Sequence, residues 1–95
     1  MLTWVIYDIS DDNIRTHSAD VCKKYGLYRV QKSCFLGEIN KNQRDSLTLE
    51  LGGLMEEEDS IYIFPTCEKC AGNITLLGQG FDMELVRDQI GVMFL

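Results

Sequence analysis

The side chain best placed to do chemistry is Asp8, which ends a short apolar run, 4–7, near the start of the chain. A carboxylate that closes a buried strand needs a proton, a metal ion or a charged partner, because burying a lone charge is costly. If two copies met around a two-fold axis, their Asp8 carboxylates would supply hard oxygen ligands for Mg²⁺, Mn²⁺ or Ca²⁺. Such an ion could position a phosphodiester or activate water. Two alternatives stay open: Asp8 caps the helix that follows, or it pairs with Arg15 or Arg29.

The other reactive side chains offer less chemistry. His17 is the only histidine and has no metal-binding neighbour in the sequence, so no nucleophilic triad can be assembled. Cys67 and Cys70 form a Cys-x-x-Cys pair, but a four-ligand zinc site would need a second pair from a dimer partner. A thioredoxin-like site would need a helix that begins at the pair, whereas we predict a short strand after Cys70. We therefore expect Cys67 and Cys70 to be unpaired, reduced thiols.

Basic residues are concentrated in the first half of the chain. Residues 1–44 carry seven basic and five acidic side chains, whereas 45–95 carry two basic and ten acidic ones, in a chain of net charge −6. A bound polyanion would therefore contact the first half. The candidates are spread over a helix, a hairpin and a loop, which suits backbone phosphates better than base edges: Arg15, Arg29, Lys32, Ser33 and Lys41. Alternatively, these charges are merely solvated on helix faces.

These side chains are positioned by a predicted order of strand, helix, strand, strand, helix, strand. Strands are predicted at 4–7, as a hairpin over 27–39 that breaks near 32–33, and at 60–65, where Pro65 ends the last one. Helices are predicted at 12–25, which Gly26 terminates, and at 40–55, which begins with capping-box spacing between Asn40 and Gln43. This order indicates an α+β, ferredoxin-like βαββαβ fold, an antiparallel sheet with both helices on one face.

The first and fourth predicted strands are apolar on both faces. In the first strand, alternation places Trp4, Ile6 and Asp8 on one face and Val5 and Tyr7 on the other. Because the two helices cover only one face of such a sheet, the other face should be covered by a sheet-to-sheet homodimer. Alternation alone does not tell which face is which.

The chain is expected to form one domain, 1–80, followed by a C-terminal tail, 81–95, that packs on a partner or on the dimer. Within 73–77 we predict a short C-terminal strand, added to the chain's own sheet or to a partner's, and the tail has a weak helical pattern. No apolar run approaches the length of a membrane span and no secretory signal pattern opens the sequence. We therefore expect a cytoplasmic protein without membrane contact and with reduced cysteines.

Several of these segments together resemble a known protein family. The motifs that carry the resemblance are Val5-Ile6-Tyr7-Asp8-Ile9 with Asp11, Asp12 and Arg15, then Tyr25-Gly26, then Arg29-Val30-Gln31-Lys32-Ser33-Cys34-Phe35 with Gly37, and then Asp59-Ser60-Ile61-Tyr62-Ile63. Over nearly all of residues 1–78, they resemble the small ferredoxin-like subunit of CRISPR spacer acquisition, the family numbered second among the CRISPR-associated proteins. One departure is Cys34, where the family usually has valine.

The resemblance implies a homodimer with Asp8 near its axis, a divalent ion such as Mg²⁺ there, and a phosphodiesterase (endonuclease) activity that is credited to members but disputed. It also implies a non-catalytic role, in which the dimer binds the duplex DNA of a new spacer and bridges integrase subunits, with the tail as a contact for the integrase. We expect the second role, because one aspartate per subunit is few ligands for two-metal chemistry. The alternatives are a metal-dependent endoribonuclease that acts alone on single-stranded RNA, and a ligand-sensing ferredoxin-like module without nucleic acid.

Overall fold

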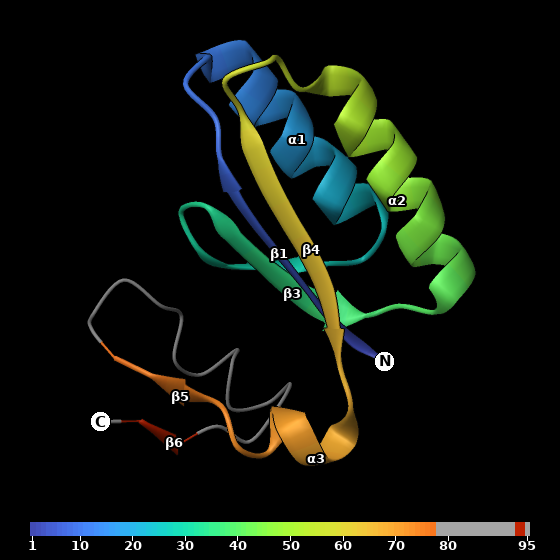
Figure 1. Cartoon of the computed structure of the whole chain (residues 1–95), viewed down its shortest axis with the longest axis vertical. Helices are drawn as coiled ribbons and strands as arrows, with labels where there is room; N and C mark the ends of the chain where they lie inside the picture. The colour runs from blue at the N-terminus through green and yellow to red at the C-terminus, as the bar shows by residue number, and fades with distance from the viewer. Residues whose placement is uncertain (78–92, 95) are drawn as a thin grey trace.

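The computed structural model describes residues 1–77 and 93–94 (Figure 1). Its main body has the predicted order of strand, helix, strand, strand, helix, strand, which confirms the α+β, ferredoxin-like fold. Short elements follow this body. The elements are β1 (Leu2–Asp8), α1 (Asp12–Lys24), β2 (Tyr28–Gln31), β3 (Cys34–Glu38), α2 (Lys41–Leu54), β4 (Ser60–Thr66), α3 (Glu68–Ala71), β5 (Thr75–Leu76) and β6 (Met93–Phe94).

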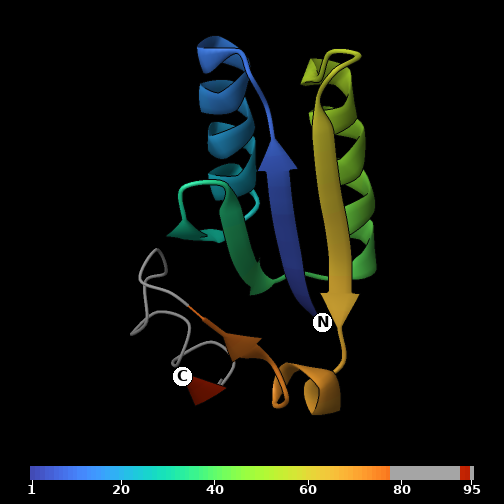
Figure 2. The ribbon, with the colours of Figure 1, turned by 60° about the vertical axis from the view of Figure 1, so that its left-hand side comes forward.

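The four long strands form one antiparallel sheet in the order β2-β3-β1-β4. β1 is central, as its buried apolar run predicts, and Ile6 lies opposite Cys34 on one neighbour and Tyr62 on the other. Figure 2 shows α1 and α2 together on one side of the sheet, with α3 beyond its lower end. The carboxyl end of β1, where Asp8 lies, is therefore next to the start of α1.

The helix ends follow from local chemistry. The Asp11 side chain accepts a hydrogen bond from the Ile14 backbone at 2.9 Å and caps α1. After α1, Gly26 takes φ of +85°, a left-handed conformation that glycine adopts without strain. Asn40 and Gln43 form the predicted capping box at the start of α2.

The predicted end of β4 is wrong by one residue. The strand continues through Pro65 to Thr66, and Pro65 lies opposite Thr3 of β1. Because β4 is an edge strand, a proline nitrogen on its outer side deprives no neighbour of a hydrogen bond.

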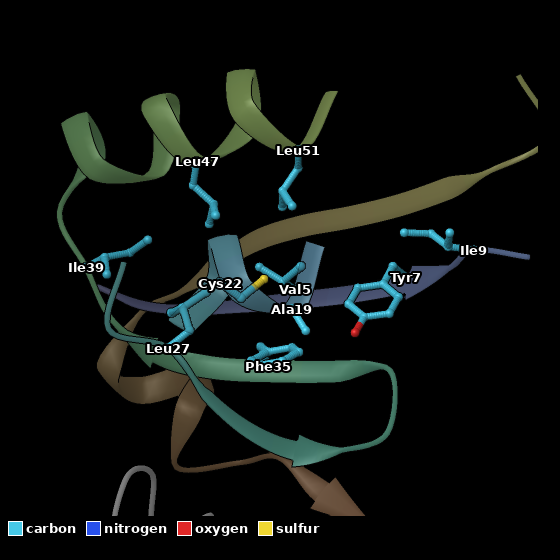
Figure 3. Close-up of a cluster of buried hydrophobic side chains, with 10 residues drawn as sticks. All are labelled: Val5, Tyr7, Ile9, Ala19, Cys22, Leu27, Phe35, Ile39, Leu47 and Leu51. Atoms are coloured by element: carbon cyan, nitrogen blue, oxygen red, sulfur yellow. The ribbon is translucent and has the colours of Figure 1, made fainter. Parts of the chain in front are cut away.

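The helix-covered face of the sheet holds the larger apolar core. Val5 and Tyr7 point to this face, which answers the question that alternation left open. The Tyr7 ring stacks on Phe35 with a centroid distance of 6.2 Å. Figure 3 shows the cluster between the sheet and the helices, and its members are Val5, Tyr7, Ile9, Ala19, Cys22, Leu27, Phe35, Ile39, Leu47 and Leu51.

The opposite face, called the open face from here on, is only partly covered. Its buried cluster is Leu2, Trp4, Val30, Cys34, Leu36 and Ala71, against which Ile74 and Leu76 pack. The segment after β4 thus covers part of the face, with Ala71 coming from α3. Three large apolar side chains on β1 and β4 stay accessible: Ile6 is 37%, Phe64 40% and Tyr62 64% exposed.

The strand predicted within 73–77 exists as β5, but it does not join the chain's own main sheet, which was one of the two predicted pairings; pairing with a partner's sheet stays a prediction. β5 pairs in parallel with β6 in a separate two-stranded sheet. This pairing joins segments far apart in the sequence, which local patterns do not encode.

The domain boundary predicted at residue 80 and the helical pattern predicted for the tail lie outside the described residues, except that 93–94 is extended. Among the helices that the structure describes, none is both long enough and apolar enough to cross a membrane.

Candidate metal and nucleic-acid site

Asp8 is the last residue of β1 and lies directly opposite Ser60 of β4. It is exposed, and it shares the open face with Trp4 and Ile6, as alternation predicts. Within residues 1–77 and 93–94, no hydrogen bond or ion pair engages its carboxylate. Both oxygens are therefore available to a metal ion or to another molecule.

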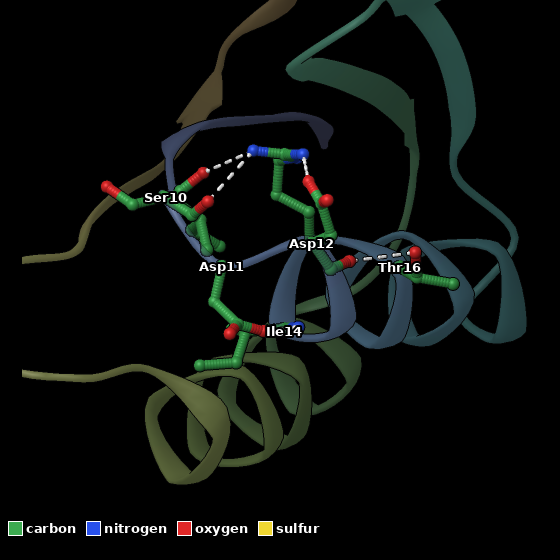
Figure 4. Close-up of polar contacts among 7 residues, drawn as sticks. Ser10, Asp11, Asp12, Ile14 and Thr16 are labelled. Atoms are coloured by element: carbon green, nitrogen blue, oxygen red, sulfur yellow. Dashed lines mark hydrogen bonds and ion pairs between the residues drawn. The ribbon is translucent and has the colours of Figure 1, made fainter.

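Other groups fill the alternative roles considered for Asp8. The cap of α1 is Asp11, not Asp8. Arg15 donates from Nη1 to the carbonyl oxygens of Ile9 at 3.1 Å and Ser10 at 3.2 Å, and its Nη2 pairs with the Asp12 carboxylate (Figure 4). Arg15 therefore holds the turn between β1 and α1 instead of neutralising Asp8.

Arg29, the other candidate partner for Asp8, lies over the opposite face of the sheet. Its guanidinium carbon is 5.1 Å from the centroid of the Phe35 ring, a cation–π contact that holds the cation above the helix-side core. Neither arginine therefore compensates Asp8.

Three of the predicted cations meet at a small surface cavity. Arg15 from α1, Arg29 from β2 and Lys32 from the hairpin turn line a hollow of about 140 Å³, together with Tyr7 and Thr16. The sequence places these residues far apart, and the packing of the hairpin beside α1 brings them together. A cavity with three cations on its wall suits a phosphate group of a polyanion.

The other two predicted contacts differ in position. Ser33, in the turn after β2, accepts a hydrogen bond through its carbonyl from the Tyr7 backbone at 3.0 Å, so it lies beside the end of β1. Lys41 begins α2 at the opposite end of the sheet, because β3 runs antiparallel to β1, and its Nζ lies 2.9 Å from Asp45. Ser33 therefore joins the Asp8 end of the molecule, whereas Lys41 does not.

The acidic loop 56–59, which joins α2 to β4, lies at the same end of the sheet as Asp8. The pKa of the exposed Glu56 carboxyl is raised by the negative charge of Glu58, by desolvation, and by the negative charges of Asp11 and Asp59. Because Ser60, directly after this loop, lies opposite Asp8, the loop lies near the start of α1, on the β4 side. The cation-lined cavity is on the β2 side, so the two charges flank β1.

A metal ion at Asp8 would need ligands from outside this chain. No group of three or more histidine, cysteine or acidic side chains within 1–77 and 93–94 is arranged to hold one. A single exposed carboxylate with no partner fits half of a shared site, since Mg²⁺ binds one or two carboxylates and keeps several waters.

The four cysteines are all free and form two classes. Cys22 and Cys34 are buried, and burial raises their pKa to about 12 and about 11. Cys67 and Cys70 are exposed, and α3 begins at this pair with Cys67 as its N-cap. The sequence-based objection that no helix starts there is therefore wrong, because a four-residue helix is too short to produce a periodic pattern.

The sequence matches the family model of CRISPR associated protein Cas2 over residues 1–74. It is 40% identical over 96 aligned residues to CRISPR-associated endoribonuclease Cas2 1 of Archaeoglobus fulgidus, and the alignment covers 100% of both chains. The fold is similar to the crystal structure of Streptococcus pyogenes Cas2, with a TM-score of 0.64 and 26% identity over 72% of this chain and 88% of that one.

A third relative has a different architecture. Over 39 residues, 41% of this chain, the sequence is 38% identical to a CRISPR-associated endonuclease Cas1/endonuclease Cas2 fusion from Thermoproteus tenax. The aligned part is 15% of that protein, which carries Cas1 and Cas2 in one polypeptide.

Proposed function

Because the chain belongs to the CRISPR-associated Cas2 family, we propose that it is a dimeric adaptor of spacer acquisition that binds duplex DNA and bridges integrase subunits. The adaptor role needs two copies, a surface for DNA and a contact with the integrase. Each requirement has its own support.

The observation that carries the proposal is the incomplete open face. Ile6, Tyr62 and Phe64 are adjacent on β1 and β4, and each exposes more than a third of its surface. The Trp4 ring stacks on Phe64 at a centroid distance of 6.3 Å, and a hollow of about 240 Å³ lies beside them under Ile74 and Leu76. Contiguous apolar surface of this kind marks an interface, and a second copy of the same sheet is the simplest cover.

The support for duplex DNA is the cation-lined cavity. Arg15, Arg29 and Lys32 come from different elements and line one small cavity, which favours contact with backbone phosphates. In a two-fold dimer, the cavity would occur twice. Two such cavities suit a duplex that spans both subunits.

The support for an integrase partner is the fused relative. In the Thermoproteus tenax protein, Cas1 and Cas2 are joined covalently, so the two are made in equal amounts and stay together. We propose that this chain makes the corresponding contact without covalent fusion, and that its tail contributes.

The DNA part of the proposal is tested with duplex DNA at several salt concentrations. The double variant Arg29→Ala/Lys32→Ala should weaken binding and flatten the dependence of log K on log salt by about 0.9 for each phosphate that the protein no longer neutralises. Lys41→Ala is the matched control and should change binding less, because Lys41 lies at the other end of the sheet and is paired with Asp45. Binding that does not respond to salt would favour the ligand-sensing module instead.

A second candidate function is a Mg²⁺-dependent endoribonuclease, and the observation that favours it is the unengaged Asp8 carboxylate. The relative from Archaeoglobus fulgidus is named an endoribonuclease. When bound, a divalent ion would polarise a phosphodiester or a water molecule, and Asp8 from each copy would hold it. The protein's own contribution would be to fix two carboxylates at one end of the sheet, while the cation-lined cavities at the same end, on the other face, would bind the substrate's phosphates.

The variants Asp8→Asn and Asp8→Ala separate the two functions. If the chain is an adaptor only, Asp8→Ala supports spacer acquisition as well as wild type does. If it is a nuclease, Asp8→Asn loses cleavage of single-stranded RNA or of DNA in the presence of Mg²⁺, Mn²⁺ or Ca²⁺. Equal cleavage by wild type and Asp8→Asn would show that the activity does not depend on this carboxylate.

A further inference from the structure

The turn that begins α3 brings two thiols together. Cys67 is the residue before the helix, with φ of −69° and ψ of 164°, and Cys70 lies in its first turn. The backbone N–H of Cys70 donates to the Cys67 sulfur with a donor-to-sulfur distance of 3.3 Å. Residues three apart on a helical turn lie side by side, so only a small adjustment brings their sulfur atoms to bonding distance.

The two thiols have different chemical roles. Hydrogen bonds from the backbone N–H and the thiol of Cys70 lower the pKa of Cys67. The same contact raises the pKa of Cys70, since its thiol donates to Cys67 and lies beside the negative charge there. Cys67 is therefore the thiol that loses its proton first and attacks, and Cys70 is the one that follows.

Cys67 and Cys70 differ from the other two cysteines in their exposure to solvent. Both Cys67 and Cys70 are exposed, and Cys67 lines a surface cavity of about 570 Å³. Cys22 and Cys34 are buried and hold their protons, so they are poor nucleophiles. A small reagent in solution therefore meets only the pair at α3.

We propose that Cys67 and Cys70 form a redox-active dithiol, which low-molecular-weight disulfides such as oxidised glutathione convert to an intramolecular disulfide. The Cys67 thiolate attacks one sulfur of the reagent, forms a mixed disulfide and releases one thiolate. Cys70 then loses its proton, attacks the Cys67 sulfur and releases the second thiolate. The protein dithiol is oxidised by two electrons, and the reagent is reduced to two thiols.

The sequence itself provides a clean assay. Trypsin cleaves after Lys69, between the two cysteines, and leaves peptides 45–69 and 70–87. The full chain is incubated with oxidised glutathione, its remaining thiols are alkylated, and the digest is read by mass spectrometry. We expect the two peptides to be joined by a disulfide before reduction and separate after it, while peptides 16–23 and 33–41, which hold Cys22 and Cys34, carry no glutathione.

Two variants identify the order of attack. Cys70→Ser should stop at one glutathione on Cys67 and lose the linked peptides, whereas Cys67→Ser should react more slowly at Cys70. The proposal is overturned if wild type yields no linked peptides, or if glutathione stays on both cysteines without ring closure. Mixing isotopically labelled and unlabelled chains gives a further check, because linked peptides of mixed label would show a bond between copies instead.

Discussion

The two faces of the four-stranded sheet differ in how far a single chain completes them. On the helix-covered face, α1 and α2 bury ten side chains in one cluster, which includes Phe35 and Leu47 with no exposed surface. On the open face, α3 and the segment at Ile74 and Leu76 cover only one end of the sheet. The same strand, β1, contributes side chains to both faces, but only the helix-covered face is fully covered by the single chain.

This difference indicates what each face does. The helix-covered face stabilises the single chain, because it buries more apolar side chains away from water than the open face does. The open face carries Asp8 and the exposed side chains of Ile6, Tyr62 and Phe64, whereas the cation-lined cavity lies beside Tyr7 and Arg29 on the helix-covered face. Along β1, residues that stabilise the single chain therefore alternate with residues that are available for association.

The variant Leu47→Ala should have the largest effect on the core of the helix-covered face. Leu47 has no exposed surface and packs between α2 and the sheet, so its truncation should lower the free energy of unfolding by about 2–5 kcal/mol. Leu49 on the same helix is 79% exposed, and Leu49→Ala is the matched control, with an expected change within about 0.5 kcal/mol. Urea denaturation measures both, and equal losses would refute the assignment of the core.

The variant Gly37→Ala tests how tightly the helix-covered face is packed around Leu27. A Cβ at Gly37 would lie 2.9 Å from Leu27 Cδ2 and 3.1 Å from the Gly26 carbonyl oxygen, a backbone atom that cannot move aside cheaply. The expected loss of stability is about 1–3 kcal/mol. Gly53→Ala in α2 meets nothing within 4 Å and should instead stabilise by up to about 1 kcal/mol. Changes of the same sign in both variants would contradict this packing.

Each face of the sheet has one buried thiol, and the pH dependence of the free energy of unfolding reports on both. Cysteine in the unfolded chain ionises near its ordinary pKa of 9.0. Burial raises the pKa of Cys22 on the helix-covered face to about 12, and that of Cys34 on the open face to about 11. Because both folded pKa values are raised, the free energy of unfolding is unaffected by these thiols' ionisation below pH 9. Above that pH, it falls by up to about 1.4 kcal/mol per pH unit for each thiol.

The measurement is the free energy of unfolding of wild type, Cys22→Ala and Cys34→Ala at several pH values on either side of 9.0. Each variant should fall less steeply than wild type above that pH. Lysine and tyrosine titrations are common to all three proteins, so they cancel in the difference. Parallel curves would show that the thiols ionise in the folded chain as readily as in the unfolded one.

Local features of the sequence predict most of the fold. The bounds of α1 follow from the acidic N-cap cluster and Gly26, α2 follows from its capping box, and the hairpin breaks at residues 32–33 as predicted. Long-range features were not predictable. Which face the helices cover and the pairing of β5 with β6 depend on contacts between distant segments, and α3 is too short for a periodic pattern.

The candidate site shows the same division. The position of Asp8 at the end of the central strand is readable from residue types and alternation. The grouping of Arg15, Arg29 and Lys32 around one cavity is not, because it depends on how the hairpin packs beside α1. The placement of Lys41 at the other end follows only from the antiparallel register of β3.

The proposed dimer at the open face is tested most directly by sedimentation equilibrium. Wild type should sediment with twice the 10.9 kDa of one chain, and Tyr62→Asp, which places a charge on the exposed apolar surface, should sediment as a single chain with unchanged helix content. Leu49→Asp, on the outer side of α2, is the control and should remain a dimer. A wild-type protein that sediments as one chain, or a Tyr62→Asp variant that remains a dimer, would contradict the central claim.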